Sequence, residues 1–268
     1  MKRILPTIGF TALLYGVTLY FGLHVKRLTF AEPQDMRRGL PSSSLLSLSE
    51  LPNDASGNRV RRGAQLFDYT SVYASSHARA KLSCSSCHAA GGIQPFAIPL
   101  IGAPSFFPMF SHRAGRMISL RDRIQECFVR SENGTPLGND DSEMEALISY
   151  IEWISGHRAP GPIAGRGLIG LPNLKGDPAK GEVTYRSQCA GCHGLEGRGD
   201  WPLFPPLWGE DSFNDGAGMN KIPKMAAFIQ HNMPQNRPGV LSAQDAFDLS
   251  AFIHLKPRPH FDQRYSGY

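Results

Sequence analysis

Two stretches decide the fold of this chain: CSSCH at residues 84–88 and CAGCH at residues 189–193. Both have the pattern C-x-x-C-H, in which two thiols attach a haem covalently and the adjacent histidine ligates its iron. A zinc site built from all four cysteines, or a disulfide bond within each motif, is the alternative. Because a repeated helical frame surrounds both motifs, we favour two covalently bound haem c groups. The predicted attachment and proximal-ligand residues are Cys84, Cys87, His88, Cys189, Cys192 and His193.

The repeated frame places one helix before each motif and another well after it. The earlier helices contain GAQLF at 63–67 and GEVTY at 181–185, both with the pattern Gly-x-x-x-aromatic. The later helices, at 142–155 and 242–255, share the pattern L-x-x-aromatic-I, so the chain holds two copies of one module. The predicted capping pairs of the later helices are Ser142 with Glu145 and Ser242 with Asp245.

We therefore predict a mainly α fold with two cytochrome c-like haem domains in tandem, preceded by an N-terminal transmembrane helix. The predicted order is a membrane anchor or signal (1–30), a tether (31–58), domain 1 with the first haem (59–157), a linker (158–178) and domain 2 with the second haem (179–268). The glycine and proline density of the linker indicates a segment without regular structure.

The composition is that of a folded protein. The chain has 268 residues, of which 41% are hydrophobic and 19% are charged. Its net charge of +5 points to acidic partners. Nucleic acid is a poor fit, because no run of lysine and arginine with interleaved aromatics is present.

The N-terminus contains a long uncharged segment. From Ile4 to Val25, 22 residues include no Asp, Glu, Lys or Arg, which is long enough to span a bilayer as a helix. We favour an uncleaved anchor over a removed signal peptide, whose apolar region is usually shorter. Since haem attachment of this type takes place outside the cytoplasm, we expect the rest of the chain on the periplasmic side.

The distal ligand of the second haem is a choice among several downstream side chains. Met219 lies in a glycine-rich segment, and Met233 lies 40 residues after His193. Methionine is a common distal ligand of electron-transfer cytochromes. Met225 is expected in the core of a helix, and the spacing leaves both Met219 and Met233 open.

Cys127 is the one cysteine outside the two motifs. It lies 39 residues after His88, close to the 40 residues between His193 and Met233. A buried apolar thiol is the alternative, but a lone thiol in an oxidising compartment calls for a reason. We predict that Cys127 is the distal ligand of the first haem, on a helix whose N-cap is Ser119.

Five arginines surround Cys127 in the sequence. A solvated helix face or clamps for haem propionates would account for them. A pocket for an anion is the more specific hypothesis, because guanidinium groups bind oxyanions through paired, charge-assisted hydrogen bonds. These residues are Arg113, Arg116, Arg121, Arg123 and Arg130.

The sequence resembles the dihaem thiosulfate dehydrogenases that form tetrathionate. The resemblance covers roughly residues 60–255, and its most specific part is the segment around Cys127. The matching segments are CSSCHAAGG (84–92), ECFVRSENGTPL (126–137), CAGCHGLEGRGD (189–200), FNDGAGMN (213–220) and AAFIQHNMP (226–234).

The resemblance implies that haem 1, with His88 and Cys127 as axial ligands, is the catalytic centre. Arg113, Arg123 and Ser131 match the positions that line the family's substrate pocket. For haem 2, the resemblance favours Met219 over Met233. Gly218 stands where family members can carry a lysine, and the N-terminal anchor departs from soluble, signal-cleaved members.

The resemblance also implies the activity: two thiosulfates joined into tetrathionate, with two electrons passing through haem 1 and haem 2 to an acceptor. That acceptor is a small cytochrome, a high-potential iron–sulfur protein or a terminal oxidase. Three alternatives stay open: an anchored dihaem electron carrier without catalysis, a haem subunit of a sulfur-oxidising complex, and the same enzyme acting as a tetrathionate reductase.

Overall fold

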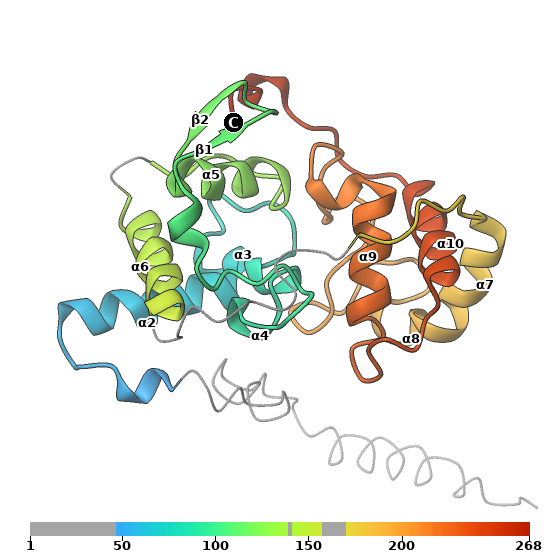
Figure 1. The fold of residues 1–268 in the computed structure, drawn as a ribbon, viewed down its shortest axis with the longest axis horizontal. Coiled ribbons are helices and arrows are strands. Elements are labelled where there is room, and N and C mark those ends of the chain that lie inside the picture. The colour runs from blue at the N-terminus through green and yellow to red at the C-terminus, as the bar shows by residue number, and fades with distance from the viewer. Residues whose placement is uncertain (1–46, 139–140, 157–169) are drawn as a thin grey trace, which may run out of the picture. The chain divides into compact units, whose positions relative to one another are not determined.

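The computed structural model describes residues 47–138, 141–156 and 170–268 (Figure 1). Two helical modules follow one another along this part of the chain. The first module comprises α2 (Ala55–Asp68), α3 (Thr70–Tyr73), η3 (Cys84–Ser86), α4 (Ala89–Gly92), η4 (Ala103–Phe106), β1 (Met109–Ser111), β2 (Arg116–Ile118), α5 (Leu120–Arg130) and α6 (Ser142–Gly156), with η2 (Leu48–Glu50) before it. The second module comprises α7 (Pro178–Gln188), α8 (Ala190–His193), η5 (Gly218–Asn220), α9 (Ile222–Asn232) and α10 (Ala243–His254), with η6 (Gln263–Tyr265) after it.

The predicted membrane anchor at 1–30 lies outside the described residues, as does most of the tether. Among the residues that the structure does describe, no helix is both long and apolar enough to cross a membrane.

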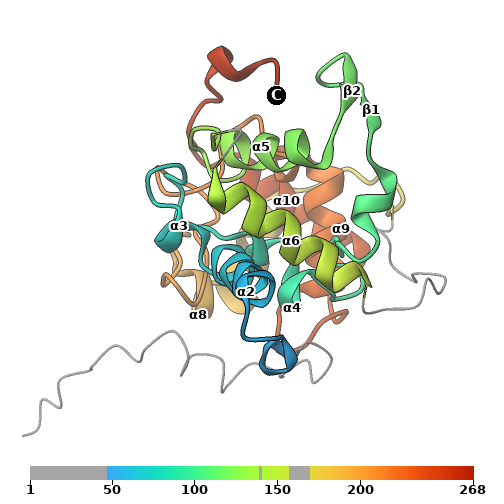
Figure 2. The same ribbon diagram turned by 90° about the vertical axis from the view of Figure 1, so that its left-hand side faces the viewer.

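Helix α6 crosses α2 in the first module, as Figure 2 shows, and α10 packs on α7 in the second. A glycine allows each crossing. A Cβ atom at Gly63 would lie 2.0 Å from the carbonyl oxygen of Ala146, and one at Gly181 would lie 2.0 Å from that of Asp248. The two backbones can approach this closely only where the side chain is hydrogen. The repeat predicted from the sequence is thus confirmed as a repeated helix crossing.

The aromatic residues of the repeat meet beside these crossings. The ring centroids of Phe67 and Tyr150 lie 5.2 Å apart in the first module, and those of Tyr185 and Phe252 lie 5.4 Å apart in the second. All four side chains are buried, so each pair adds aromatic contact to the burial of apolar surface.

Gly63→Ala is expected to lower the free energy of unfolding by about 3 kcal/mol, because a methyl group would collide with backbone rather than with a movable side chain. For a chain of this size, the melting temperature should fall by roughly 10 °C. Calorimetry of the haem-loaded protein measures this. Gly156→Ala is the matched control, since a Cβ there would meet no atom of another described segment within 4 Å. Equal melting temperatures for both variants would contradict the close crossing.

The capping predictions have different outcomes for the two later helices. For α10 the prediction is confirmed: Ser242 Oγ accepts from the backbone N–H of Asp245 at 3.1 Å, and the Ser242 N–H donates to Asp245 Oδ2 at 3.0 Å. For α6 it is wrong. Ser142 is already helical, and Asp141 Oδ1 accepts from the Glu143 N–H at 2.9 Å. The aspartate immediately before the serine accepts from the first turn in its place.

Two hydrophobic cores hold the modules. The first contains Leu66, Phe67, Phe128, Met144, Leu147 and Ile154 among its most buried residues. The second contains Tyr185, Trp208, Phe247, Leu249 and Ile253. Ala80 and Leu82, which precede the first C-x-x-C-H motif, pack in the second core. The segment around the first motif therefore packs against both modules.

Candidate functional site

The first C-x-x-C-H motif forms a tight turn beside α2. The backbone N–H of His88 donates to the carbonyl of Cys84 at 2.9 Å, and the Cys84 N–H donates to Thr70 Oγ1 at 3.1 Å. Burial, followed by the charge of Glu132, raises the pKa of the Cys87 thiol to about 12. The thiol of Cys87 is therefore neutral and held away from water.

His88 presents one ring nitrogen to the protein. Its Nδ1 lies 2.6 Å from the carbonyl oxygen of Ile98, so Nδ1 carries the proton and donates. Burial lowers the pKa of His88 to about 4, and the ring is neutral. The lone pair is then on Nε2, which is the arrangement that a metal-ligating imidazole requires.

The second motif repeats this arrangement. His193 Nδ1 lies 2.9 Å from the carbonyl oxygen of Pro205, and burial lowers the pKa of His193. Cys189 and Cys192 lie at the end of α7 and in α8. The donor sets of both modules therefore fit covalently attached haem.

The two alternatives to haem do not form. All five cysteines are free thiols, so neither motif closes a disulfide. Within the described ranges, no group of three or more His, Cys, Asp or Glu side chains is placed to hold a metal ion. A zinc site would need all four cysteines together, whereas the two motifs belong to different modules.

Both candidate distal ligands of the second haem lie beside the second core. Met219 is in η5, and Met233 follows the last residue of α9; each side chain is partly buried against that core. Met225 is buried within it, as expected. Met219 and Met233 thus remain the two candidates.

Cys127 lies on α5, one helical turn after Arg123. The Nη1 of Arg123 donates to Cys127 Sγ at 3.3 Å and to Glu126 Oε2 at 3.2 Å. The electrostatic interaction with Cys127, followed by that with Glu126 and opposed by burial, raises the pKa of Arg123. The predicted N-cap is confirmed, since Ser119 Oγ accepts from the Asp122 N–H at 3.1 Å. The cap fixes where α5 begins, and Cys127 and Arg123, four residues apart, then lie on one face of this helix.

The five arginines differ in the groups with which they form ion pairs and hydrogen bonds. Arg116 pairs with Asp122 at 3.0 Å, and Arg121 pairs with Glu145. Arg130 is buried, donates to the main-chain oxygen of Tyr268 at 2.7 Å and stacks on the ring of Phe261 at 3.8 Å. Each of these three arginines is thus engaged by another group of the chain. Arg123 also pairs with Glu126, but its guanidinium contacts Cys127, so Arg113 and Arg123 stay the candidates for an anion.

The other predicted pocket residues lie on two elements. Ser131 directly follows α5, and its backbone N–H donates to the carbonyl of Cys127 at 2.8 Å. Arg113 is exposed in the turn between the paired strands β1 and β2. Burial, followed by the positive charge of Arg113, lowers the pKa of Arg130, so this turn lies near α5.

Sequence reasoning missed three groups around Cys127. Glu126 is buried and shares Arg123 with the thiol. Lys224, on α9 of the second module, lies near the same arginines: partial burial first and neighbouring positive charges second, Arg113 and Arg123 among them, lower its pKa. Glu132 is buried, and its Oε2 has no hydrogen-bond partner in the described part of the chain. Only Glu126, three residues from Arg123 on one helix, could have been found by its spacing.

Glu132 gives a pH-dependent prediction. Burial raises its pKa from 4.5 to about 8, so the folded protein keeps this carboxyl neutral while the unfolded chain ionises. With respect to Glu132, the free energy of unfolding is therefore highest below about pH 4.5, where this carboxyl is neutral in both states. It falls as the pH rises towards 8, because only the unfolded chain ionises freely. Glu132→Gln should stabilise the protein by about 3 kcal/mol near pH 7 and by almost nothing near pH 4. Urea unfolding at both pH values measures this, and a pH-independent difference would contradict it.

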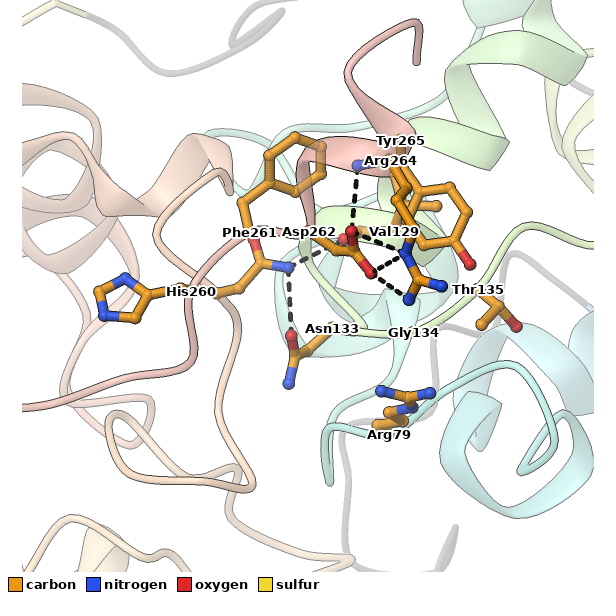
Figure 3. A pocket seen from close by; sticks show the side chains of 11 residues that line it. Arg79, Val129, Asn133, Gly134, Thr135, His260, Phe261, Asp262, Arg264 and Tyr265 are labelled. Carbon is orange, nitrogen blue, oxygen red and sulfur yellow. Dashed lines mark hydrogen bonds and ion pairs between the residues drawn. The ribbon is translucent and has the colours of Figure 1, made fainter.

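A hollow of about 360 Å³ lies elsewhere, between the end of α5 and the C-terminal segment (Figure 3). Arg79 and Arg264 reach into it, and Arg264 is paired with Asp262. None of the predicted site residues lines it. The candidate active site is therefore defined by the side chains around Cys127 and not by this hollow.

Comparison with known proteins agrees with the geometry of both motifs. Residues 70–158 match the family model described as SoxA/TsdA, cytochrome c domain, and residues 176–253 match that of cytochrome C oxidase, cbb3-type, subunit III. A thiosulfate dehydrogenase from Stutzerimonas stutzeri is 38% identical over 81% of this chain and 73% of its own length. The chain belongs to the thiosulfate dehydrogenase family. A second family member, from Allochromatium vinosum, is 35% identical over 87% of this chain and 88% of its own.

A solved structure agrees as well. The thiosulfate dehydrogenase (TsdBA) from Marichromatium purpuratum superposes with a TM-score of 0.76 at 33% identity, over 83% of this chain. The chain spans half the length of that solved chain. This thiosulfate dehydrogenase family member is thus a mainly helical oxidoreductase with two cytochrome c domains in tandem, and it carries two haem c groups.

Proposed function

We propose that this chain oxidises thiosulfate and joins two molecules of it into tetrathionate on the periplasmic side of the cytoplasmic membrane. The observation that carries the proposal is the hydrogen bond of 3.3 Å from Arg123 to Cys127 Sγ. It supports the proposal because it brings a thiol and a guanidinium group together, in a chain whose relatives are named thiosulfate dehydrogenase.

Each module would hold one haem through its own residues. Cys84 and Cys87 would attach haem 1, and His88 and Cys127 would ligate its iron. Cys189 and Cys192 would attach haem 2, with His193 and Met219 as its ligands and Met233 as the alternative. When bound, the two haems accept single electrons and pass them on to an acceptor.

The side chains around Cys127 bind and orient the anion. Arg113 and Arg123 form charge-assisted hydrogen bonds with the sulfonate oxygens of thiosulfate, and Ser131 supplies a hydroxyl. Lys224 adds a positive charge from the second module. A dianion beside a thiolate is repelled in a partly buried site, and these cations offset that repulsion.

The chemistry at Cys127 takes two steps. First, Cys127 Sγ forms a disulfide bond with the sulfane sulfur of one thiosulfate, and two electrons leave. Second, the sulfane sulfur of another thiosulfate attacks the sulfane sulfur of the adduct, which forms tetrathionate and releases the Cys127 thiolate. Two thiosulfate dianions thus yield one tetrathionate dianion and two electrons, and no proton is consumed.

The proposal includes the surroundings of the enzyme. The uncharged segment Ile4–Val25 would anchor the chain in the membrane, unless it is removed as a signal. The acceptor would be a small cytochrome, a high-potential iron–sulfur protein or a terminal oxidase.

An assay of the purified, haem-loaded chain with ferricyanide as acceptor tests the proposal. Ion chromatography should find one tetrathionate for every two thiosulfates consumed, and two ferricyanides should be reduced. Sulfite or sulfate as the product, or no consumption of thiosulfate, would overturn it.

A further inference from the structure

The loop after His88 has an unusual backbone. Ala90, Phe96 and Ile98 have φ values of +53°, +64° and +49°, a region that residues other than glycine rarely occupy. For the β-branched Ile98 this conformation is strained, and it persists only where surrounding contacts hold it.

The strain at Ile98 has a consequence for His88, because the carbonyl of Ile98 accepts the hydrogen bond from His88 Nδ1. In the second module, the corresponding acceptor is the carbonyl of Pro205, and the proline ring itself restricts φ. Ile98 has no ring that fixes its own φ, and within the chain only the following Pro99 restricts it. Contacts from the second module add to this restraint on the loop.

Asn232 of the second module makes these contacts. Its Nδ2 donates to the carbonyl of Phe96 at 3.0 Å, and its Oδ1 accepts from Gln94 Nε2 at 3.2 Å. Nδ2 also donates to the carbonyl of Phe228 on α9 at 3.0 Å. The ring of Phe96 stacks on that of His231, with centroids 5.0 Å apart. The side chain of Asn232 is almost fully buried, so these bonds have no competition from water.

We propose that Asn232 is a positioning residue for the proximal side of haem 1: from the second module it holds the loop at 94–98, so that the carbonyl of Ile98 receives the proton of His88 Nδ1. A strong acceptor at Nδ1 makes the imidazole more basic and stabilises the oxidised iron that it ligates. The second module thereby sets the reduction potential of the first haem. This inference rests on the proposed ligation by His88, but it does not depend on thiosulfate as the substrate.

Asparagine suits this position because the loop needs one donor and one acceptor from the same side chain. Asn232→Asp keeps the size of the side chain and the acceptor for Gln94, but it removes both bonds from Nδ2. Asn232→Ala removes every bond. Asn236→Ala is the matched control, because Asn236 is exposed and lies four residues away.

The test is a redox titration of the haem-loaded full chain without thiosulfate, combined with electron paramagnetic resonance of the oxidised form. In Asn232→Asp and Asn232→Ala, the potential of haem 1 should rise and its low-spin signal should broaden. Asn236→Ala should match the wild type. Hydrogen exchange at residues 94–98 should be faster in both Asn232 variants.

Gln94→Ala is the second variant. It leaves Asn232, α9 and the neighbouring Met233 intact, removes one bond to the loop and should raise the haem 1 potential by a smaller amount. If the Asn232 variants do not fold, this variant decides alone.

An unchanged haem 1 potential in Gln94→Ala and in every folded Asn232 variant would overturn the proposal. So would a shift confined to haem 2, because Asn232 would then act on Met233. A shift at haem 1 in a protein that does not oxidise thiosulfate would uphold this inference and reject the proposed function.

Discussion

Cys127→Ala is expected to abolish tetrathionate formation, with kcat reduced by at least about a thousandfold, which corresponds to about 4 kcal/mol of lost transition-state stabilisation. The variant lacks both the sulfur that bonds to thiosulfate and the proposed distal ligand of haem 1. Stopped-flow absorbance with thiosulfate and the haem-loaded protein measures this loss. Haem content should stay at two per chain, because Cys127 belongs to neither attachment motif.

Cys127→Met separates the two roles of the residue. A thioether ligates haem iron but cannot form a disulfide bond with thiosulfate. This variant should therefore keep a low-spin spectrum at haem 1 and still fail to form tetrathionate. If either variant turned over thiosulfate at a rate close to that of the wild type, the assignment of Cys127 as the nucleophile would be wrong.

Arg123→Gln has the second largest expected effect, a rise of roughly 10- to 100-fold in KM for thiosulfate. The variant removes a guanidinium group that lies 3.3 Å from Cys127 Sγ, and a charge-assisted hydrogen bond is worth about 1.5 to 3 kcal/mol. Arg123→Lys should fall between the variant and the wild type, since a point charge replaces a planar fork. Steady-state kinetics with ferricyanide gives these values.

Two control variants separate an effect on thiosulfate affinity from an effect on protein stability. Arg123→Gln leaves the buried carboxylate of Glu126 without its partner, so the protein could lose stability as well as affinity. The double variant Arg123→Gln/Glu126→Gln removes that unpaired charge and should keep the raised KM. Arg121→Gln, on the same helix but paired with Glu145, should leave KM unchanged. Equal KM values for Arg121→Gln and Arg123→Gln would contradict an anion pocket at Arg123.

Local patterns in the sequence were enough to predict the repeated frame. A glycine four residues before an aromatic permits a close helix crossing, and Gly63 and Gly181 both make one. Ser119 and Ser242 cap their helices because capping depends on residues within one turn. The same rule failed at Ser142, where the preceding aspartate accepts the hydrogen bond from the first turn.

Contacts between segments that are distant in the chain could not be predicted from the sequence. Five arginines near Cys127 look alike there. Only the structure shows that Arg116 and Arg121 pair with carboxylates and that the buried Arg130 donates to the main chain of Tyr268. Asn232 reads as an ordinary residue at the end of a helix. Its role depends on a loop that lies more than a hundred residues earlier in the chain.

Peptide mass spectrometry after a single turnover shows whether the sulfur chemistry takes place on Cys127. The oxidised, haem-loaded protein is mixed with less than one equivalent of thiosulfate and an excess of ferricyanide, so that no second thiosulfate can complete the reaction. The peptide containing Cys127 should gain the mass of one S₂O₃ group, which a reducing thiol removes. Consumption of the thiosulfate with this peptide unmodified would contradict it.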